Sequence, residues 1–249
     1  MAQQPVKAVF FDLGETLLTF GRLRLGRLFR RSARLTYDYL VQLGQPVGPL
    51  GLYALRNLAA IRFCHIGATL TGRDFDALQL LKRVNGKIGV ELTDQQWDEL
   101  IWKWYQPLAQ KAWIEPDIAA TLDRLRQMHL KLGILSNTFI NRCCLERHLE
   151  QIGIRRYFDV CLFSYEFPKR KPHPSIFIKA ADRLGCRLTN IAYVGDRLDN
   201  DIKPALKLQM HAVMKNAYTN KYAKPAKNAH RIDTLAELPA LIEQINHES

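Results

Sequence analysis

Residues 9–17 read VFFDLGETL, and this stretch decides the fold. It continues the mostly apolar run Val6–Phe11, which fits a strand that is buried on both faces of a sheet. The run ends abruptly at Asp12, and a turn that contains Gly14 follows. The sequence therefore predicts a central strand with a carboxylate at its end, which is where ligands bind in parallel α/β sheets.

Four more short apolar runs repeat this pattern further along the chain: Leu130–Leu135, Asp159–Phe163, Ile191–Val194 and His211–Met214. Stretches with the period of an amphipathic helix lie between and around them. These helical stretches are Ile118–Met128, Asn141–Gln151, Pro174–Leu184, Asp201–Leu208 and Leu235–Ile245. Strands that alternate with helices predict an α/β fold with a Rossmann-like, doubly wound parallel sheet.

The alternation is interrupted between about residue 18 and residue 112. Here helical patterns follow one another without strands: Arg24–Gly44, Leu50–Ile66, Phe75–Asn85 and Asp94–Gln110, the last with Thr93 or Asp94 as a plausible N-cap. We therefore expect a core domain made of residues 1–17 and 113–249, with an all-α domain of residues 18–112 inserted after the first strand.

Bulk composition narrows the functional classes. The chain has 36 Lys and Arg against 24 Asp and Glu, a net charge of +12, which favours anionic ligands. It lacks zinc-finger spacing and an aromatic-rich RNA-binding signature, so small anions are favoured over nucleic acid. No apolar run reaches the ~18 residues of a membrane span, and Val6–Phe11 is too short for a signal peptide.

The five cysteines are odd in number and contain no Cys-x-x-Cys pair. This pattern indicates reduced thiols in a cytoplasmic protein. The adjacent Cys143 and Cys144 admit a redox or metal role, but no His or Cys partner with ligand spacing lies nearby, so helix packing is favoured.

Polar residues follow three of the predicted strands. Asp12, Ser136 and Asp196 each stand where a buried strand ends. Because the carboxyl ends of parallel strands share one edge of a sheet, these side chains are expected to gather there. A carboxylate can act as a nucleophile, and oxygen ligands suit a hard ion such as Mg²⁺.

Four segments resemble one known family in their order and spacing. They are VFFDLGETL at 9–17, LGILSN at 132–137, Lys171-Pro172 before a helix, and VGDRLDND at 194–201. The set resembles the haloacid dehalogenase (HAD) superfamily, within it the phosphatase-like branch, and the helical insertion stands where that family places a C1-type cap.

The resemblance implies a role for each matching residue. Asp12 and Lys171 would be catalytic, with Asp12 as nucleophile and Lys171 neutralising negative charge. Ser136, the backbone N–H of Asn137 and Lys171 would hold the phosphoryl group. Mg²⁺ would be bound by Asp12, the carbonyl of Gly14 and Asp196. Supporting roles behind these groups would fall to Thr16, Asn200 and Asp201, whereas Asp199 would face solvent.

Gly14 departs from the family pattern. Most family phosphatases have an Asp there, which protonates the leaving group; such general acid catalysis contributes roughly 10²- to 10⁴-fold. Glu15 could be a displaced acid. Two functions follow: Mg²⁺-dependent hydrolysis of a small phosphomonoester through an aspartyl phosphate, or a weak or inactive relative that acts as a binding module. The metal-type segment at 194–201 favours phosphate over haloacid chemistry.

A basic stretch opens the inserted domain. Six arginines fall within 13 residues: Arg22, Arg24, Arg27, Arg30, Arg31 and Arg34. At helical spacing several of them lie opposite an apolar face. They form either a solvated helix face or a surface that captures an anionic leaving group or an acidic partner.

Overall fold

The computed structural model describes residues 4–224 and 226–248. The chain forms two compact units. Unit 1 consists of Met1–Gly21, Trp113–Asn137 and Ile152–Ser249, and unit 2 of Arg22–Ala112 and Thr138–Gln151. The second unit is thus inserted into the first, with an additional segment that returns to it later in the chain.

Unit 1 is built on a six-stranded sheet with the order β3-β2-β1-β4-β5-β6. The strands are β1 (Ala8–Phe11), β2 (Lys131–Ser136), β3 (Val160–Phe163), β4 (Ile191–Gly195), β5 (His211–Lys215) and β6 (His230–Ile232). All neighbouring strands are parallel. The predicted doubly wound parallel sheet is confirmed, and β6 is an addition that the sequence patterns did not indicate.

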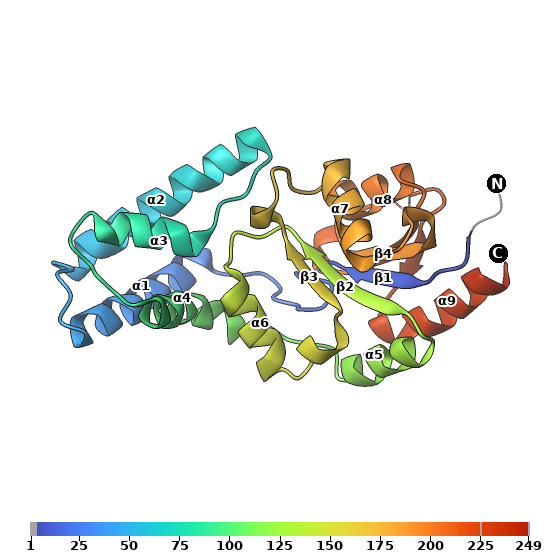
Figure 1. The fold of residues 1–249 in the computed structure, drawn as a ribbon, viewed down its shortest axis with the longest axis horizontal. Helices are drawn as coiled ribbons and strands as arrows, with labels where there is room; N and C mark the ends of the chain where they lie inside the picture. The colour runs from blue at the N-terminus through green and yellow to red at the C-terminus, as the bar shows by residue number, and fades with distance from the viewer. Residues whose placement is uncertain (1–3, 225, 249) are drawn as a thin grey trace. The chain divides into compact units, whose positions relative to one another are not determined.

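Helices cover both faces of this sheet (Figure 1). The helices α5 (Ile118–Gln127) and α9 (Leu238–His247) lie on one face, and α7 (Pro174–Leu184) and α8 (Lys203–Lys207) lie on the other. Short 3-10 turns occur at Arg155–Tyr157, Ser164–Glu166, Leu188–Asn190, Tyr218–Asn220 and Leu235–Glu237. Because β1 is central, its residues are buried throughout, as expected for a strand covered on both sides.

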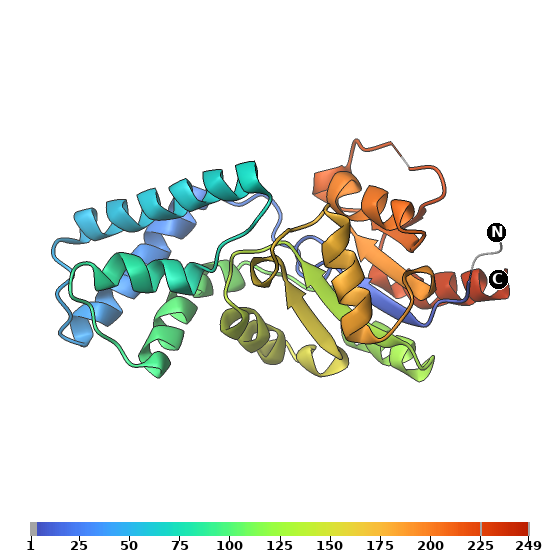
Figure 2. The ribbon, with the colours of Figure 1, turned by 45° about the horizontal axis from the view of Figure 1, so that its top comes forward.

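Unit 2 is all-helical. It contains α1 (Leu25–Gln42), α2 (Leu50–Thr71), α3 (Ala77–Gly86), α4 (Asp94–Ala109) and α6 (Arg142–Gln151). Figure 2 shows α2 and α3 running side by side. Thr93 caps α4 through a complete capping box with Gln96, one of the two N-caps that the sequence suggested.

The helix α6 follows a core strand in the sequence but packs with unit 2. The Tyr105 hydroxyl lies 2.9 Å from His148 Nδ1, Arg147 pairs with Glu99 at 2.8 Å, and Asn141 donates to the carboxylate of Asp76. The expected insertion of residues 18–112 did not include α6, whereas the compact unit begins at Arg22 and contains it.

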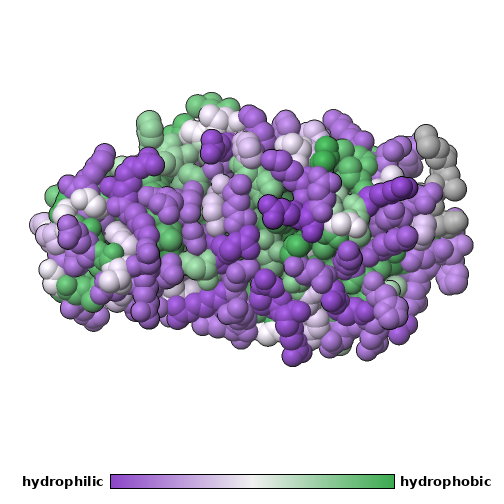
Figure 3. All heavy atoms as spheres, viewed as in Figure 1, coloured by the Kyte–Doolittle hydropathy of each residue, from purple (hydrophilic) through white to green (hydrophobic). Residues whose placement is uncertain are grey.

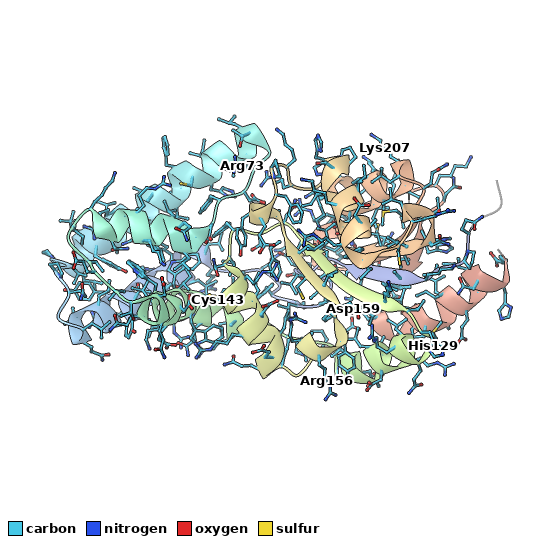
Figure 4. All side chains as sticks on the ribbon, in the orientation of Figure 1. Arg73, His129, Cys143, Arg156, Asp159 and Lys207 are labelled. Carbon is cyan, nitrogen blue, oxygen red and sulfur yellow. The ribbon has the colours of Figure 1, made fainter. Side chains whose placement is uncertain are left out.

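The adjacent cysteines and the basic stretch lie in unit 2. Cys143 lies on α6, as labelled in Figure 4, and Cys144 beside it is buried. All six arginines of the basic stretch are exposed, which fits a solvated face and an anion-binding surface alike. Among the described residues, none of the helices combines the length and apolar character needed to cross a membrane.

Candidate active site

The loop after β1 is wound tightly around Asp12. The Asp12 N–H donates to the carbonyl of Val194 at 2.9 Å, which ties the end of β1 to β4. The N–H groups of Leu17 and Leu18 both donate to the carbonyl of Leu13, at 3.0 and 2.8 Å. Asp12 is therefore held, almost fully buried, at the carboxyl edge of the sheet.

Lys171 is the cation at the centre of the site. Its Nζ lies 3.0 Å from Asp12 Oδ1 and 2.7 Å from Asp201 Oδ1, and it donates to the Tyr193 hydroxyl at 2.8 Å and to the Leu135 carbonyl at 3.1 Å. Burial alone would lower the pKa of Lys171, but the negative charges of Asp12 and Asp201 outweigh it and raise this pKa well above its ordinary value. Lys171 is therefore a permanently charged group next to Asp12.

Asn137 fixes the backbone that carries Lys171. Its side-chain amide donates to the carbonyl of Lys171 at 2.8 Å and accepts from the Lys171 N–H at 2.9 Å. This reciprocal pair joins the segment after β2 to the loop before α7, a role for the Asn137 side chain that the sequence did not indicate. Ser136, the last residue of β2, is buried beside it.

Three buried carboxylates meet at this edge of the sheet. Oxygen atoms of Asp12, Asp196 and Asp201 all lie within 4.8 Å of one another. Burial, followed by the charge of Asp12, raises the pKa of Asp196 to about 7. Asp12 Oδ1 has no hydrogen-bond partner in the described part of the chain, although it lies 3.0 Å from Lys171 Nζ. One lysine against three carboxylates leaves excess negative charge, and a divalent cation with oxygen ligands fits this donor set.

Asp201 and Asp196 are held differently. Both oxygens of Asp201 are engaged, one by Lys171 and the other by the Arg197 N–H at 2.9 Å, so it is placed to orient Lys171. Gly195 makes this possible, because a Cβ there would lie 2.6 Å from the Asp201 side chain. Asp196 accepts a hydrogen bond from Thr219 on one oxygen, and its other oxygen has no recorded hydrogen bond among the described residues.

Three supporting residues were missed by sequence reasoning. Tyr193 touches Lys171 but lies within an apolar run, where a tyrosine is typical of a core position. Thr219 bonds Asp196, and the Asn220 amide donates to the carbonyl of Asp196 at 2.8 Å and to that of Lys215 at 2.7 Å. The only available signal for Tyr193 was a hydroxyl in an otherwise apolar strand.

The remaining predicted residues lie at the margin of this cluster. Thr16 is buried, but its hydroxyl has no hydrogen-bond partner among the described residues. Asn200 is half-buried in the π-helical turn Leu198–Ile202. Asp199 is exposed and pairs with Lys203 at 2.6 Å, as expected for a solvent-facing acid.

Glu15 is not part of the carboxylate cluster and binds backbone N–H groups instead. Its Oε1 accepts the N–H groups of Phe20 at 2.9 Å and Gly21 at 3.1 Å, so it clamps the last residues of unit 1 before unit 2 begins. Its backbone φ of 57° is unusual for a residue with a side chain. Glu15 lines a pocket of ≈ 470 Å³ together with Trp113 and Lys215. These contacts favour a positioning role over that of a displaced acid.

Glu15→Gln should retain most of the stability of the parent, because an amide oxygen can still accept the two N–H groups. Glu15→Ala should lose about 1–3 kcal/mol, since both donors become unsatisfied. Glu15→Gly should fall between them because it removes the clamp but also relieves the backbone. Urea unfolding of the three variants checks this order; equal stability of Gln and Ala would contradict the clamp.

The raised pKa of Asp196 predicts how the metal-free protein responds to pH. Between the ordinary carboxyl pKa and about 7, the folded state holds a proton that the unfolded state has lost, so stability should fall as pH rises through this window. Urea unfolding in EDTA at pH 5 and pH 8 measures this effect. The loss on raising the pH should be smaller in Asp196→Asn; an identical loss in both proteins would refute this origin.

Buried acids and a lysine at the carboxyl edge of a parallel α/β sheet are the main features of this site. Comparison with protein families identifies the class of protein that has them. Residues 6–208 match the family model described as haloacid dehalogenase-like hydrolase. The chain therefore belongs to the haloacid dehalogenase-like hydrolase family, which confirms the family resemblance seen in the four segments.

Several curated relatives are named as phosphatases. A glyceraldehyde 3-phosphate phosphatase of Methanopyrus kandleri is 40% identical over 39% of this chain and 41% of its own length. The enzyme of the same name from Methanocaldococcus jannaschii is 32% identical over 53% and 58%. The chain thus spans about half the length of these relatives. An N-acylneuraminate-9-phosphatase of Rattus norvegicus is 27% identical over 99% of this chain and 97% of its own.

Solved structures show the same fold. A HAD phosphatase from Thermococcus onnurineus matches with a TM-score of 0.60 and 25% identity over 95% of this chain and 98% of that one. A 2-haloacid dehalogenase from Pseudomonas syringae matches with a TM-score of 0.68 and 22% identity over 96% and 99%. The second likeness, at this identity, concerns the fold alone.

Proposed function

We propose that this protein is a Mg²⁺-dependent phosphatase that hydrolyses a small phosphomonoester through an aspartyl phosphate on Asp12. The observation that carries the proposal is the buried arrangement of Asp12 and Lys171 at 3.0 Å beside Asp196 and Asp201. A carboxylate next to a fixed cation and a cluster of oxygen donors is suited to attack on phosphorus. The phosphatase names of the relatives support the same reaction class.

In the first step, a carboxylate oxygen of Asp12 forms a bond to phosphorus while the bond from phosphorus to the leaving oxygen breaks. Lys171 offsets the negative charge that gathers there, and Asp201 and Tyr193 hold its ammonium in place. The hydroxyl of Ser136 and the N–H of Asn137 bind phosphoryl oxygens. Water then attacks phosphorus and releases phosphate, which restores the Asp12 carboxylate.

Mg²⁺, held by Asp12, the carbonyl of Gly14 and Asp196, would supply positive charge that lets one anion approach another. The other oxygen of Asp196 and the unbonded Oδ1 of Asp12 are the observations that support this ligand set. Gly14 contributes only a backbone carbonyl, so its lack of a side chain leaves this ligand intact.

The alternative, a weak or inactive relative that binds a partner, draws on Gly14 and on the exposed arginines of the basic stretch. Turnover of a panel of phosphorylated metabolites with Mg²⁺ and with EDTA separates the two. The panel should include glyceraldehyde 3-phosphate and N-acylneuraminate 9-phosphate, the substrates named for relatives. Mg²⁺-dependent release of phosphate from at least one compound is expected; no release from any ester, anhydride or acyl phosphate by folded, metal-binding protein would favour the binding module.

A further inference from the structure

The outward face of α2 is apolar and uncovered. Five large side chains on it are more than half exposed: Leu52 58%, Leu55 64%, Phe63 79%, Ile66 60% and Leu70 82%. With the exposed Ala59 they recur every three or four residues, so they form one continuous band, which we call the α2 stripe. Figure 3 shows apolar atoms at the surface along the C-terminal part of α2.

The α2 stripe lies opposite the face that α2 buries within unit 2. Tyr53, Asn57 and Ala68 are the buried residues of α2, and they fall on the other side of the helix. A surface helix of a globular protein ordinarily turns a polar face to water, whereas the outward face of α2 is apolar. Contiguous exposed apolar patches of this kind mark interaction surfaces. Nothing in unit 2 covers the stripe.

We propose that the α2 stripe is the contact between two copies of this chain, paired through antiparallel α2 helices. A two-fold axis near residue 61 places Leu52 of one copy at the level of Leu70 of the other. Phe63 then lies at the level of Ala59, so the largest side chain of the stripe meets its smallest. Large residues that fill the space beside small ones are what close helix packing requires, and the contact is the same for both copies.

The area agrees with a weak, specific dimer. Each of the five exposed side chains offers roughly 100 Å² of apolar surface. A symmetric pair would then bury about 1,000 Å² in total, which is the lower end for a specific protein interface. We therefore expect association in the micromolar range, which is measurable with the full chain.

Charge gives this dimer a distinctive response to salt. The helix α2 contains no acidic residue, and Arg62 flanks the stripe close to the proposed axis, so it would face Arg62 of the second copy. Arg73, labelled in Figure 4, is exposed just beyond the C-terminal end of α2. Added salt screens like charges, so it should strengthen the dimer. An acidic partner on the same stripe would be released by salt instead.

Sedimentation velocity of the full chain at about 1–100 µM, in low and in high salt, tests the proposal. A dimer that tightens with salt is expected. Phe63→Lys with Leu70→Lys should weaken it by about 100-fold or more, whereas Leu25→Lys should not. Leu25 is a matched control because it is 70% exposed on α1, outside the stripe. A monomer in both salts, or a dimer that persists in the double variant with an unchanged circular dichroism spectrum, would overturn the proposal.

The antiparallel register has its own test. Arg62→Cys should give a disulfide-linked dimer under mild oxidation much faster than the parent, because this position lies next to the two-fold axis. Arg62→Gln should also bind its second copy more tightly at low salt, since the like-charge contact is removed. A dimer in which neither substitution changes linkage or affinity would contradict this register.

Discussion

Asp12→Asn is expected to reduce the proposed Mg²⁺-dependent phosphatase turnover by at least about 10³-fold, because one substitution removes the proposed nucleophile and weakens a proposed metal ligand. The fold should persist. Asp12 is one of three crowded carboxylates, and its charge contributes to the raised pKa of Asp196, so its neutralisation relieves repulsion in the metal-free protein. Circular dichroism and the unfolding midpoint are the controls.

Lys171→Met provides the contrast in stability. Among the described residues, it removes the one cation that is paired with both Asp12 and Asp201. Loss of one partner from a buried ion pair costs about 3–5 kcal/mol, so this variant should be much less stable than Asp12→Asn.

Activity in Asp12→Asn that matches the parent in the same assay would remove Asp12 from the chemistry.

Gly14→Asp is expected to raise turnover of substrates with poor leaving groups by about 10²- to 10⁴-fold. Position 14 lacks a general acid, so the parent should cleave aryl phosphates far faster than simple alkyl phosphates, and the added carboxyl should flatten this dependence. The structure accommodates the change: a Cβ at Gly14 meets nothing within 4 Å, and its φ is not in the left-handed region. Metal affinity should change little, since the Gly14 carbonyl stays.

Gly14→Asn is the matched control because it adds similar volume without a proton to give. Rates for a series of phosphate esters of different leaving-group pKa, measured where chemistry limits turnover, distinguish the three proteins. If the parent already shows a flat dependence, another residue donates the proton, and Glu15 would be the next to substitute.

The sheet could be predicted because its strands are apolar throughout. Val9 and Phe10 point to opposite faces of the sheet and both are buried. Strands of this kind leave an unbroken apolar run in the sequence. The strand β6 left no such pattern because His230–Ile232 has only three residues. The packing of α6 with unit 2 depends on contacts such as that of Tyr105 with His148, which are distant in sequence and invisible to local periodicity.

The residues of the candidate site also fall into those that could be predicted from the sequence and those that could not. Asp12, Lys171, Asp196 and Asp201 lie in segments with recognisable order, and the structure brings them together at one edge of the sheet. The groups that hold them there were not predictable, because the side chain of Asn137 and the hydroxyl of Tyr193 act through tertiary contacts.

Glu15 shows the limit most clearly. Its place in the loop suggested a general acid that replaces the missing Asp. Instead, its carboxylate accepts hydrogen bonds from the N–H groups of Phe20 and Gly21, at the end of the loop. Which way a side chain leaves a turn depends on backbone angles, and these are set by the whole loop.

The stereochemical course at phosphorus tests the central claim most directly. A phosphorothioate ester made chiral at phosphorus with two oxygen isotopes would be hydrolysed with Mg²⁺ in water that carries the third isotope, so that the released thiophosphate is itself chiral. Transfer to Asp12 and then to water comprises two displacements, so the account predicts overall retention of configuration. Inversion would mean that water attacks the substrate directly, and it would contradict an aspartyl phosphate on Asp12.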